Sequence, residues 1–487
     1  MTEQHVQSEP ALFVIFGGTG DLAKRKLLPA LANIDHEGCL ADRSKIVAVG
    51  RSPMDDEAFR ASIGDALARA GFDRDRIRSA SRRIHYQALS YGREEDYRAL
   101  AKRLEELGRD MPANHAFYMA LPPQAFARTA AGLGAVGLNR NEHGWTRLVV
   151  EKPFGEDLAS ARKLNRLLHE HFDERQIYRI DHFLGKETVQ NLLVFRLANA
   201  FIESSWNRER IEAIQISVAE HIGIGKRSQY YNRAGAIRDM VQNHLTQLLT
   251  LVAMEVPISF SADAIRSEKI KVLHAIQPLG PESAVRGQYT AGSVDGANVP
   301  GYREEDGVPI DSTTETFVAM RVCIDSWRWQ GVPFYLRTGK RMPASSTQIA
   351  VRFRKAPVRF FKQYGCVSDT HDVLTITLQP EQGFTFYLGI KRPGTPLELE
   401  RIPLSFRYDQ CFGGVLRDAY QTLLLDVLVG DQTLFVHADE VEASWRVYAP
   451  LLDEPIAPRP YPAGTWGPHD ADRFAIPETD IWQRSTV

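Results

Sequence analysis

The first third of the chain alternates short apolar runs with longer segments of helical character. Residues 11–17 (ALFVIFG) form a continuous apolar run, as expected for a strand buried on both faces, and residues 45–51 (KIVAVGR) predict a second strand. Two further strands are predicted at residues 116–121 and 147–150. Strands that alternate with helical segments favour a mainly parallel, doubly wound sheet.

The hydrophobic pattern changes from about residue 178. Two helical segments surround a predicted strand at residues 213–220. After about residue 313 come four runs in which hydrophobic and polar residues alternate, ETFVAMRVCI, TQIAVRFR, DVLTITLQ and FTFYLGIK. This alternation predicts a mainly antiparallel sheet with helices on one face. Residues 418–436 predict one more helix and turn, and the Pro-rich residues 455–468 predict an extended surface segment.

Length and composition narrow the class of protein. A chain of 487 residues exceeds the size of a single core, and we place a domain boundary between residues 1–177 and 178–487. A formal charge of −2 without long runs of one sign argues against nucleic acid or a membrane as partner. A polar N-terminus and no long apolar run predict a cytoplasmic protein. No metal or disulfide site is expected from the scattered cysteines Cys39, Cys323, Cys366 and Cys411.

A glycine turn follows the first predicted strand. Gly18, Gly20 and Ala23 fit the G-x-G-x-x-G/A spacing, in which glycine permits close approach of the backbone to a pyrophosphate. The following helix offers its N-terminal amides to the negative charge. Glycine turns between strand and helix are common, but this position favours a dinucleotide site. The candidate cofactor residues in the turn are Gly17, Gly18, Thr19, Gly20, Asp21, Leu22, Ala23 and Lys24.

The end of the second predicted strand discriminates between the two nicotinamide cofactors. An NAD site usually places Asp or Glu there, to bind the ribose hydroxyls. This chain has Arg51 and Ser52, whose guanidinium and hydroxyl can bind a 2′-phosphate. The alternative is a solvated arginine at a strand end. With the glycine turn in place, we favour NADP, with NAD as a secondary acceptor.

Two helical segments carry candidate substrate chemistry. In RIDHFLGKE (residues 179–187), His182 and Lys186 are four residues apart, so one helical turn would bring two potential cations together for a phosphate. The alternative is a capped helix with Lys186 in solvent. In IRDMVQNHL (residues 237–245), His244 lies on an apolar helical stripe, where a hydrogen-bonded core histidine is the commoner finding. Oxidation of a sugar C1 hydroxyl nevertheless requires such a base, oriented by a carboxylate.

The chain resembles the glucose-6-phosphate dehydrogenase family over nearly its whole length. The matching segments, in chain order, are GGTGDLAKRKLLPAL, ALPP, VVEKPFG, RIDHFLGKETVQNLL, IRDMVQNHLTQLL, GVPFYLRTGKRM, ADEVEASWR and YPAGTWGP. The resemblance implies an N-terminal Rossmann domain that binds NADP and a larger α+β domain for substrate binding and dimerisation. It also implies oxidation of glucose 6-phosphate at C1 to the 1,5-lactone, the first step of the oxidative pentose phosphate pathway, in a homodimer or homotetramer.

The resemblance further implies roles for single residues. His244 is similar to the family's general base and Asp181 to its carboxylate partner, while His182 and Lys186 are similar to the ligands of the sugar phosphate. Arg51 and Ser52 would join the glycine turn in holding NADP. The other residues implied to bind the sugar are Glu220, Asp239, Lys340 and Lys152, the last of which would lie between sugar and nicotinamide.

Two positions depart from the family pattern. Phe183 stands where the family commonly has a tyrosine that helps to hold the phosphate, and losing one such hydrogen bond would weaken binding by roughly 1.5–3 kcal/mol. Ser345 stands where a basic residue is usual. These departures leave open a related dehydrogenase for a different or unphosphorylated sugar. A non-catalytic NADP-binding paralogue is the other alternative, although Asp181, His244 and Lys186 are all present.

Overall fold

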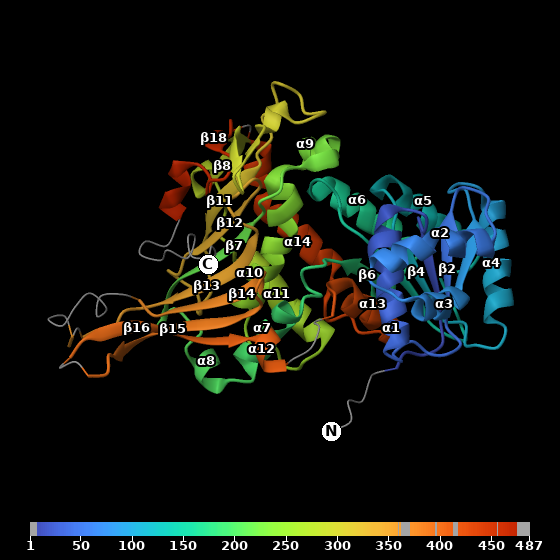
Figure 1. Cartoon of the computed structure of the whole chain (residues 1–487), viewed down its shortest axis with the longest axis horizontal. Coiled ribbons are helices and arrows are strands. Elements are labelled where there is room, and N and C mark those ends of the chain that lie inside the picture. Colours follow the sequence, from blue (N-terminus) through green and yellow to red (C-terminus); the bar gives the residue numbers. More distant parts are fainter. Residues whose placement is uncertain are drawn as a thin grey trace. The chain divides into compact units, whose positions relative to one another are not determined.

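The chain divides into two compact units (Figure 1). The first unit consists of Met1–Lys186, Ser259–Arg266 and Arg417–Glu442. The second consists of Glu187–Ile258, Ser267–Leu416 and Ala443–Val487. The computed structural model describes residues 7–358, 360–361, 371–394, 397–412, 417–454 and 456–474, so Cys366 and Pro455 lie outside the described residues.

The first unit is built on a seven-stranded sheet in the order β17-β6-β5-β4-β1-β2-β3. All neighbouring strands are parallel except the pair β6–β17. The four strands predicted in this part of the chain are confirmed as β1, β2, β4 and β5. The strand bounds are β1 Leu12–Phe16, β2 Lys45–Gly50, β3 Ile84–Ala88, β4 His115–Met119, β5 Thr146–Val150, β6 Ile177–Ile180 and β17 Phe435–Val436.

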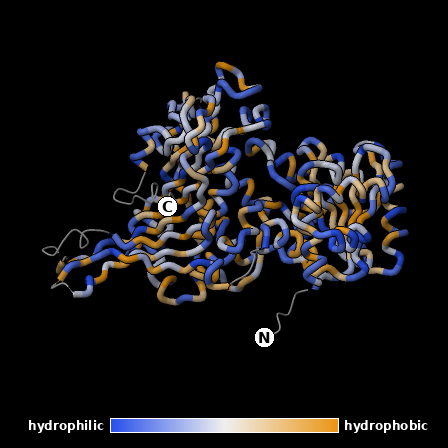
Figure 2. Tube along the Cα trace, in the orientation of Figure 1, coloured by the Kyte–Doolittle hydropathy of each residue, from blue (hydrophilic) through white to orange (hydrophobic). Residues whose placement is uncertain are grey.

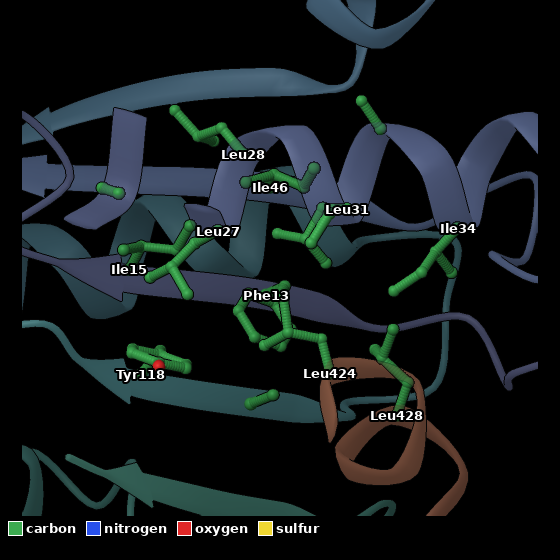
Figure 3. Close-up of a cluster of buried hydrophobic side chains, with 14 of the residues drawn as sticks. Phe13, Ile15, Leu27, Leu28, Leu31, Ile34, Ile46, Tyr118, Leu424 and Leu428 are labelled. Atoms are coloured by element: carbon green, nitrogen blue, oxygen red, sulfur yellow. The ribbon is translucent and has the colours of Figure 1, made fainter. Parts of the chain in front are cut away.

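Helices cover this sheet and bury its apolar side chains. Figure 2 shows hydrophobic residues gathered along the strands and hydrophilic residues on the surrounding helices. Phe13 and Ile15 of β1 pack with Leu27 and Leu31 of the first helical segment in one buried cluster (Figure 3). The helices are η1 Ala23–Leu27, α1 Leu28–His36, α2 Asp56–Arg69, α3 Arg74–Arg82, α4 Glu94–Gly108, α5 Phe126–Ala135, α6 Leu158–His169 and α13 Ala419–Val429.

The first unit extends beyond the predicted residues 1–177 in two ways. Strand β6 lies in the parallel sheet, so the unit continues to Lys186. The segment Arg417–Glu442 also returns to it, because Leu424 and Leu428 of α13 pack beside Phe13 (Figure 3). The prediction of a helix within residues 418–436 is confirmed, but the predicted turn ends in β17, which pairs with β6. Sequence pattern alone did not show that this late helix covers an early strand.

The second unit is built on a nine-stranded sheet in the order β16-β15-β14-β13-β7-β12-β11-β8-β18. Its pairs are antiparallel except β7–β12 and β8–β18, which confirms the predicted mainly antiparallel sheet. A short hairpin, β9–β10, stands apart. The strands are β7 Ile211–Ala219, β8 Ala284–Thr290, β9 Gly292–Val294, β10 Ala297–Val299, β11 Phe317–Val322, β12 Phe334–Gly339, β13 Ser346–Phe353, β14 Val373–Gln379, β15 Gly383–Lys391, β16 Leu399–Arg407 and β18 Arg459–Pro462.

Helices of the second unit pack on this sheet. Segment η5 contacts β7 and β12, and α7 contacts β14. The helices are α7 Glu187–Leu197, α8 Ala200–Ser204, α9 Ser228–Ala236, η5 Ile237–Leu245, α10 Thr246–Ala253, α11 Ala262–Ala275, α12 Tyr408–Phe412 and α14 Ala438–Asp453. Among the described residues, no helix is both long enough and apolar enough to cross a membrane.

The Pro-rich C-terminal segment is extended, as predicted, but it does not simply lie on the surface. Residues Arg459–Pro462 form β18, which pairs with β8 in parallel. Tyr461 is only 1% exposed, and its hydroxyl donates a hydrogen bond to the carbonyl of Lys340 at 2.7 Å. The buried ring of Tyr461 and the hydrogen bond from its hydroxyl hold β18 in place. The sequence did not predict this role, because prolines surround the tyrosine.

Substitution of Leu424 tests whether α13 belongs to the core of the first unit. Leu424 is fully buried, so Leu424→Ala should lower the free energy of unfolding by about 2–5 kcal/mol through lost apolar contact and a residual cavity. The matched substitution Ile310→Ala, at an isoleucine that is 85% exposed, should change it by about 0.5 kcal/mol or less. Urea denaturation followed by circular dichroism measures both. Equal effects of the two substitutions would contradict the assignment of α13 to the core.

Candidate active site

The turn after β1 brings the glycine segment against the second strand. The amides of Gly17 and Gly18 both donate to the carbonyl of Val49 at 2.9 Å. Gly17 has a φ of +80°, and a Cβ on Gly18 would lie 2.6 Å from the Cβ of Ala48. Glycine is therefore required here for the turn and for close packing, and the turn has the geometry predicted for a dinucleotide-binding segment.

The remaining residues of the turn open a helix. The Gly20 amide donates to the Gly17 carbonyl at 2.9 Å, and helical geometry begins at Asp21. Asp21 is exposed and pairs with Arg25 at 3.2 Å, whereas Ala23 is buried. The structure thus places the predicted set on one continuous turn and helix start, which comprises Gly17, Gly18, Thr19, Gly20, Asp21, Leu22, Ala23 and Lys24.

Arg51 and Ser52 follow β2 directly and are exposed. The Ser52 carbonyl accepts a hydrogen bond from the hydroxyl of Tyr86 at 2.7 Å. The hydroxyl of Tyr91 accepts a hydrogen bond from the Gly17 amide at 3.2 Å. Burial raises the pKa of Tyr91, while the hydrogen bond from Gly17 and the positive charge of Arg51 oppose that rise. Sequence reasoning missed Tyr91, because no motif surrounds it.

Other predicted residues follow the carboxyl ends of neighbouring parallel strands. Lys152 comes two residues after β5, in a turn whose Lys152–Pro153 peptide bond is cis. Asp181 and His182 come directly after β6. Because β4, β5 and β6 are adjacent and parallel, their carboxyl ends lie at one edge of the sheet, where ligands of doubly wound sheets bind.

Phe183 supports both potential phosphate ligands. The ammonium of Lys186 lies 3.7 Å from the centre of the Phe183 ring, and the His182 ring meets that ring at 64° with 5.1 Å between the centres. The Phe183 amide donates to Oδ1 of the buried Asp181 at 2.9 Å. The structure therefore brings His182 and Lys186 to one phenyl ring, and Asp181 to the backbone amide of the same residue. A cation over a ring face is an attractive arrangement that also keeps Lys186 from extending freely into solvent.

A partly buried ion pair holds the strand that precedes these residues. Arg179 is 1% exposed and donates to Glu174 at 2.6 Å and to Asn165 at 3.0 Å. Burial alone would raise the pKa of Glu174, but the Arg179 guanidinium overrides it and holds that pKa at about 2. Glu174 also accepts the amide of Ala438 at 2.9 Å. Sequence reasoning did not single out Glu174, which shares no motif with Arg179.

In the second unit, the structure brings Glu220 and Lys340 together. The Lys340 ammonium donates to the Glu220 carboxylate at 2.6 Å, although Lys340 is only 1% exposed. Their backbones are joined as well, because the Glu220 amide donates to the Gly339 carbonyl at 3.0 Å. The two residues follow β7 and β12, a parallel pair whose carboxyl ends necessarily lie side by side.

Asp239 and His244 lie on η5, where the winding differs from the α-helix that the sequence predicts. This segment is π-helical, with hydrogen bonds between residues five apart. In an α-helix, residues five apart diverge around the axis, whereas π-helical winding brings Asp239 and His244 toward the same side. Asp239 is buried and accepts a hydrogen bond from Tyr230 at 3.3 Å, and His244 is 1% exposed.

Glu315 fixes the start of η5. Its carboxylate accepts the Ile237 amide at 3.1 Å, and its carbonyl accepts the Ala236 amide at 3.0 Å. Gly235 has a φ of +63°, and a Cβ there would lie 2.4 Å from the carboxylate. Burial raises the pKa of Glu315. Sequence reasoning missed this cap, because 78 residues separate Glu315 from Ile237.

A histidine lies beside Ser345. The Ser345 hydroxyl accepts the amide of His221 at 3.1 Å and also contacts Nδ1 of its imidazole. His221 directly follows Glu220, so an ionisable side chain lies next to the position where Ser345 replaces the usual basic residue. The structure therefore places His221, which the motif does not include, beside Ser345.

Each of the two parts of the chain matches a sequence model of one protein family. Residues 14–191 match the sequence model "Glucose-6-phosphate dehydrogenase, NAD binding domain", and residues 193–483 match "Glucose-6-phosphate dehydrogenase, C-terminal domain". The chain is 42% identical to a glucose-6-phosphate 1-dehydrogenase of Aggregatibacter actinomycetemcomitans, covering 98% of both chains. It is 44% identical to one of Rhizobium meliloti, covering 99% of this chain and 98% of the relative.

Solved structures agree with these matches. A glucose-6-phosphate dehydrogenase in complex with its substrate glucose 6-phosphate has a TM-score of 0.89 and 35% identity, covering 96% of this chain and 97% of that chain. A Mycobacterium avium glucose-6-phosphate 1-dehydrogenase has a TM-score of 0.84 and 34% identity, with the same coverage.

The fold and the glycine turn define an oxidoreductase with an N-terminal nucleotide-binding Rossmann domain and a C-terminal domain on a mainly antiparallel sheet. Both parts match one family across nearly the whole chain. The chain belongs to the glucose-6-phosphate dehydrogenase family.

The ionisation of Lys186 gives a testable pH dependence. Burial lowers the pKa of this ammonium to about 8, with Asp181 opposing the change, so its charge is lost as the pH rises through that value. Inorganic phosphate should therefore bind about tenfold more weakly at pH 9.5 than at pH 7.5, as measured by calorimetry.

The matched variant is Lys186→Arg, whose guanidinium stays charged over this range, so its phosphate affinity should stay level. A parallel loss of affinity in the two proteins would contradict the role given to Lys186.

Proposed function

We propose that this protein oxidises glucose 6-phosphate at C1 to 6-phosphoglucono-1,5-lactone with NADP as hydride acceptor. The observation that carries the proposal is the turn after β6, where His182 and Lys186 both contact the Phe183 ring. We assign the nitrogen donors of these two side chains to one phosphate. The solved relative described as a complex with glucose 6-phosphate supports this substrate. The reaction is the first step of the oxidative pentose phosphate pathway.

In this proposal the protein moves one proton at the sugar. His244 removes the proton of the C1 hydroxyl, and Asp181 is its carboxylate partner, which fixes the tautomer and stabilises the imidazolium. Burial of His244 suits this role, because a solvent-excluded base is protected from competing proton exchange with water. His182 and Lys186 hold the phosphate and so fix the position of C1.

The sugar hydroxyls are assigned to polar groups that are already paired. Lys340 and Glu220 form a partly buried ion pair that can donate and accept hydrogen bonds without further reorganisation. Asp239, held by Tyr230, adds a further acceptor. Lys152 is assigned to the region between sugar and nicotinamide, at the strand edge after β5.

The glycine turn fits NADP. A Cβ on Gly18 would fill the space against Ala48, and the helix beginning at Asp21 offers its first amides to a pyrophosphate. Arg51 and Ser52, both exposed after β2, are assigned to the 2′-phosphate. When bound, NADP supplies the hydride acceptor. NAD, which lacks the 2′-phosphate, is proposed as a secondary acceptor.

We further propose a cytoplasmic homodimer or homotetramer that assembles through the larger sheet. Strands β15 and β16 support this proposal, because they expose Leu404 (68%), Ile390 (49%) and Ile402 (38%) near one another. Neighbouring exposed apolar side chains on a sheet are typical of a protein–protein contact.

Initial rates with glucose 6-phosphate or glucose, each with NADP or NAD, test the assignment. The rate should be highest with glucose 6-phosphate and NADP, as followed by NADPH absorbance. In Arg51→Ala, the KM for NADP should rise about tenfold while the KM for NAD stays unchanged, because only NADP carries the 2′-phosphate. Faster turnover of free glucose would favour a related dehydrogenase for unphosphorylated sugars. NADP binding without any turnover would favour a non-catalytic paralogue.

Replacement of His244 tests the base. His244→Asn should lower kcat by about 100- to 10,000-fold with the KM for glucose 6-phosphate unchanged, because the amide cannot accept the proton. The matched control is His115→Asn, at a histidine on β4 whose pKa burial lowers to about 4. His115 has no proposed role, so kcat should be retained. Normal turnover by His244→Asn would refute the role of this residue.

A further inference from the structure

Two tyrosines converge on the carboxylate of Glu151. Its Oε1 accepts hydrogen bonds from the hydroxyl of Tyr118 at 2.5 Å and from that of Tyr420 at 3.1 Å. Glu151 follows β5 directly, Tyr118 lies on the neighbouring β4, and Tyr420 lies in the first turn of α13. Burial raises the pKa of Glu151. None of these three side chains has a part in the mechanism proposed above.

On its other side, Tyr420 faces a phosphate ligand. Its ring is nearly parallel to the imidazole of His182, with an interplanar angle of 5° and 6.4 Å between the ring centres. The start of α13 lies against the turn after β6, because a Cβ on Gly185 would be 2.5 Å from the carbonyl of Ala419. Glycine at this position therefore lets α13 bring Tyr420 to His182.

These contacts connect Glu151 to His182 through Tyr420. His182 has the Phe183 ring at 64° on one side and the parallel Tyr420 ring on another. A tyrosine ring at a helix start can rotate about two side-chain bonds, and the hydrogen bond from its hydroxyl restricts that rotation. The Glu151 carboxylate therefore restrains the Tyr420 ring, which lies parallel to the imidazole of His182.

We propose that Glu151 is a positioning residue for phosphate binding, acting on His182 through Tyr420. This proposal rests on the proposed function only in taking His182 as a phosphate ligand. It places the carboxylate of the Glu-Lys-Pro turn in the substrate site, beside Lys152 but with a separate role. The residue itself touches neither phosphate nor cofactor.

The decisive variants remove the hydrogen-bond acceptor or retain it. In Glu151→Ala, the KM for glucose 6-phosphate should rise about fivefold, while kcat and the KM for NADP stay within about twofold of wild type. Glu151→Gln keeps an oxygen that accepts both hydroxyls, so its KM should return to the wild-type value. A merely structural role would lower kcat and stability together, and would not spare the KM for NADP.

The two tyrosines provide a matched pair of controls. Tyr420→Phe and Tyr118→Phe each remove one hydroxyl from the same carboxylate oxygen, but only the Tyr420 ring faces His182. The KM should therefore rise about fivefold in Tyr420→Phe and less than about twofold in Tyr118→Phe. Equal effects of the two substitutions would overturn the proposal, as would a Glu151→Gln variant that behaves like Glu151→Ala.

Direct binding separates this proposal from the proposed function. The dissociation constant of inorganic phosphate, measured by calorimetry, should rise about fivefold in Glu151→Ala and not in Glu151→Gln, whatever sugar the enzyme oxidises. If wild type fails to oxidise glucose 6-phosphate but shows this pattern, the proposed function fails and the positioning role holds. Unchanged phosphate binding in Glu151→Ala would refute the positioning role even in an active enzyme.

Discussion

The partly buried ion pair between Arg179 and Glu174 is the interaction on which the substrate end of the first unit depends. Removal of one partner from a fully buried pair typically costs about 3–5 kcal/mol, and less is expected here, because the Glu174 side chain is 20% exposed. Glu174 also accepts the amide of Ala438, so the pair ties β6 to the C-terminal segment that carries β17. Asp181 and His182 begin directly after that strand, and their placement follows from it.

The pKa of Glu174 sets the pH range over which this ion pair stabilises the fold. The pKa of Glu174 is lowered from its usual 4.5 to about 2 in the folded protein. A lowered carboxyl pKa stabilises the fold above the unfolded-state value, and that contribution is lost as the pH falls from about 4.5 toward 2. The ion pair that holds β6, the strand directly before Asp181, is therefore intact at neutral pH.

The sequence predicts four parallel strands of the first unit, β1, β2, β4 and β5, because each is a short, mainly apolar run. Strands β3 and β6 were not predicted, since IHYQA at the edge of the sheet alternates buried and half-buried residues and IYRI contains an arginine. The glycine turn and the segments around His182 and His244 were found because their chemistry lies in contiguous motifs. Tyr91, Glu315 and Tyr420 were missed, because each acts on a residue far away in the sequence and belongs to no motif.

The sequence also did not predict that η5 is a π-helix. Periodicity placed His244 on an apolar stripe but could not distinguish α-helical from π-helical hydrogen bonding, which depends on how η5 is held at its ends. Glu315 holds the first end of this segment, and the Ser444 hydroxyl contacts the Gln242 carbonyl near the other. Such contacts come from distant strands and helices and leave no local signature.

The discontinuity of the first unit has a consequence for biosynthesis. Segment Arg417–Glu442 supplies α13 and β17, so a nascent chain that has just left the ribosome with residues 1–186 lacks one cover and one edge of its sheet. Translation proceeds at about 5–20 residues per second, so the nucleotide-binding domain stays incomplete for roughly 10–50 seconds while residues 187–442 are added. During that interval the apolar surface around Phe13 is open to solvent and to chaperones.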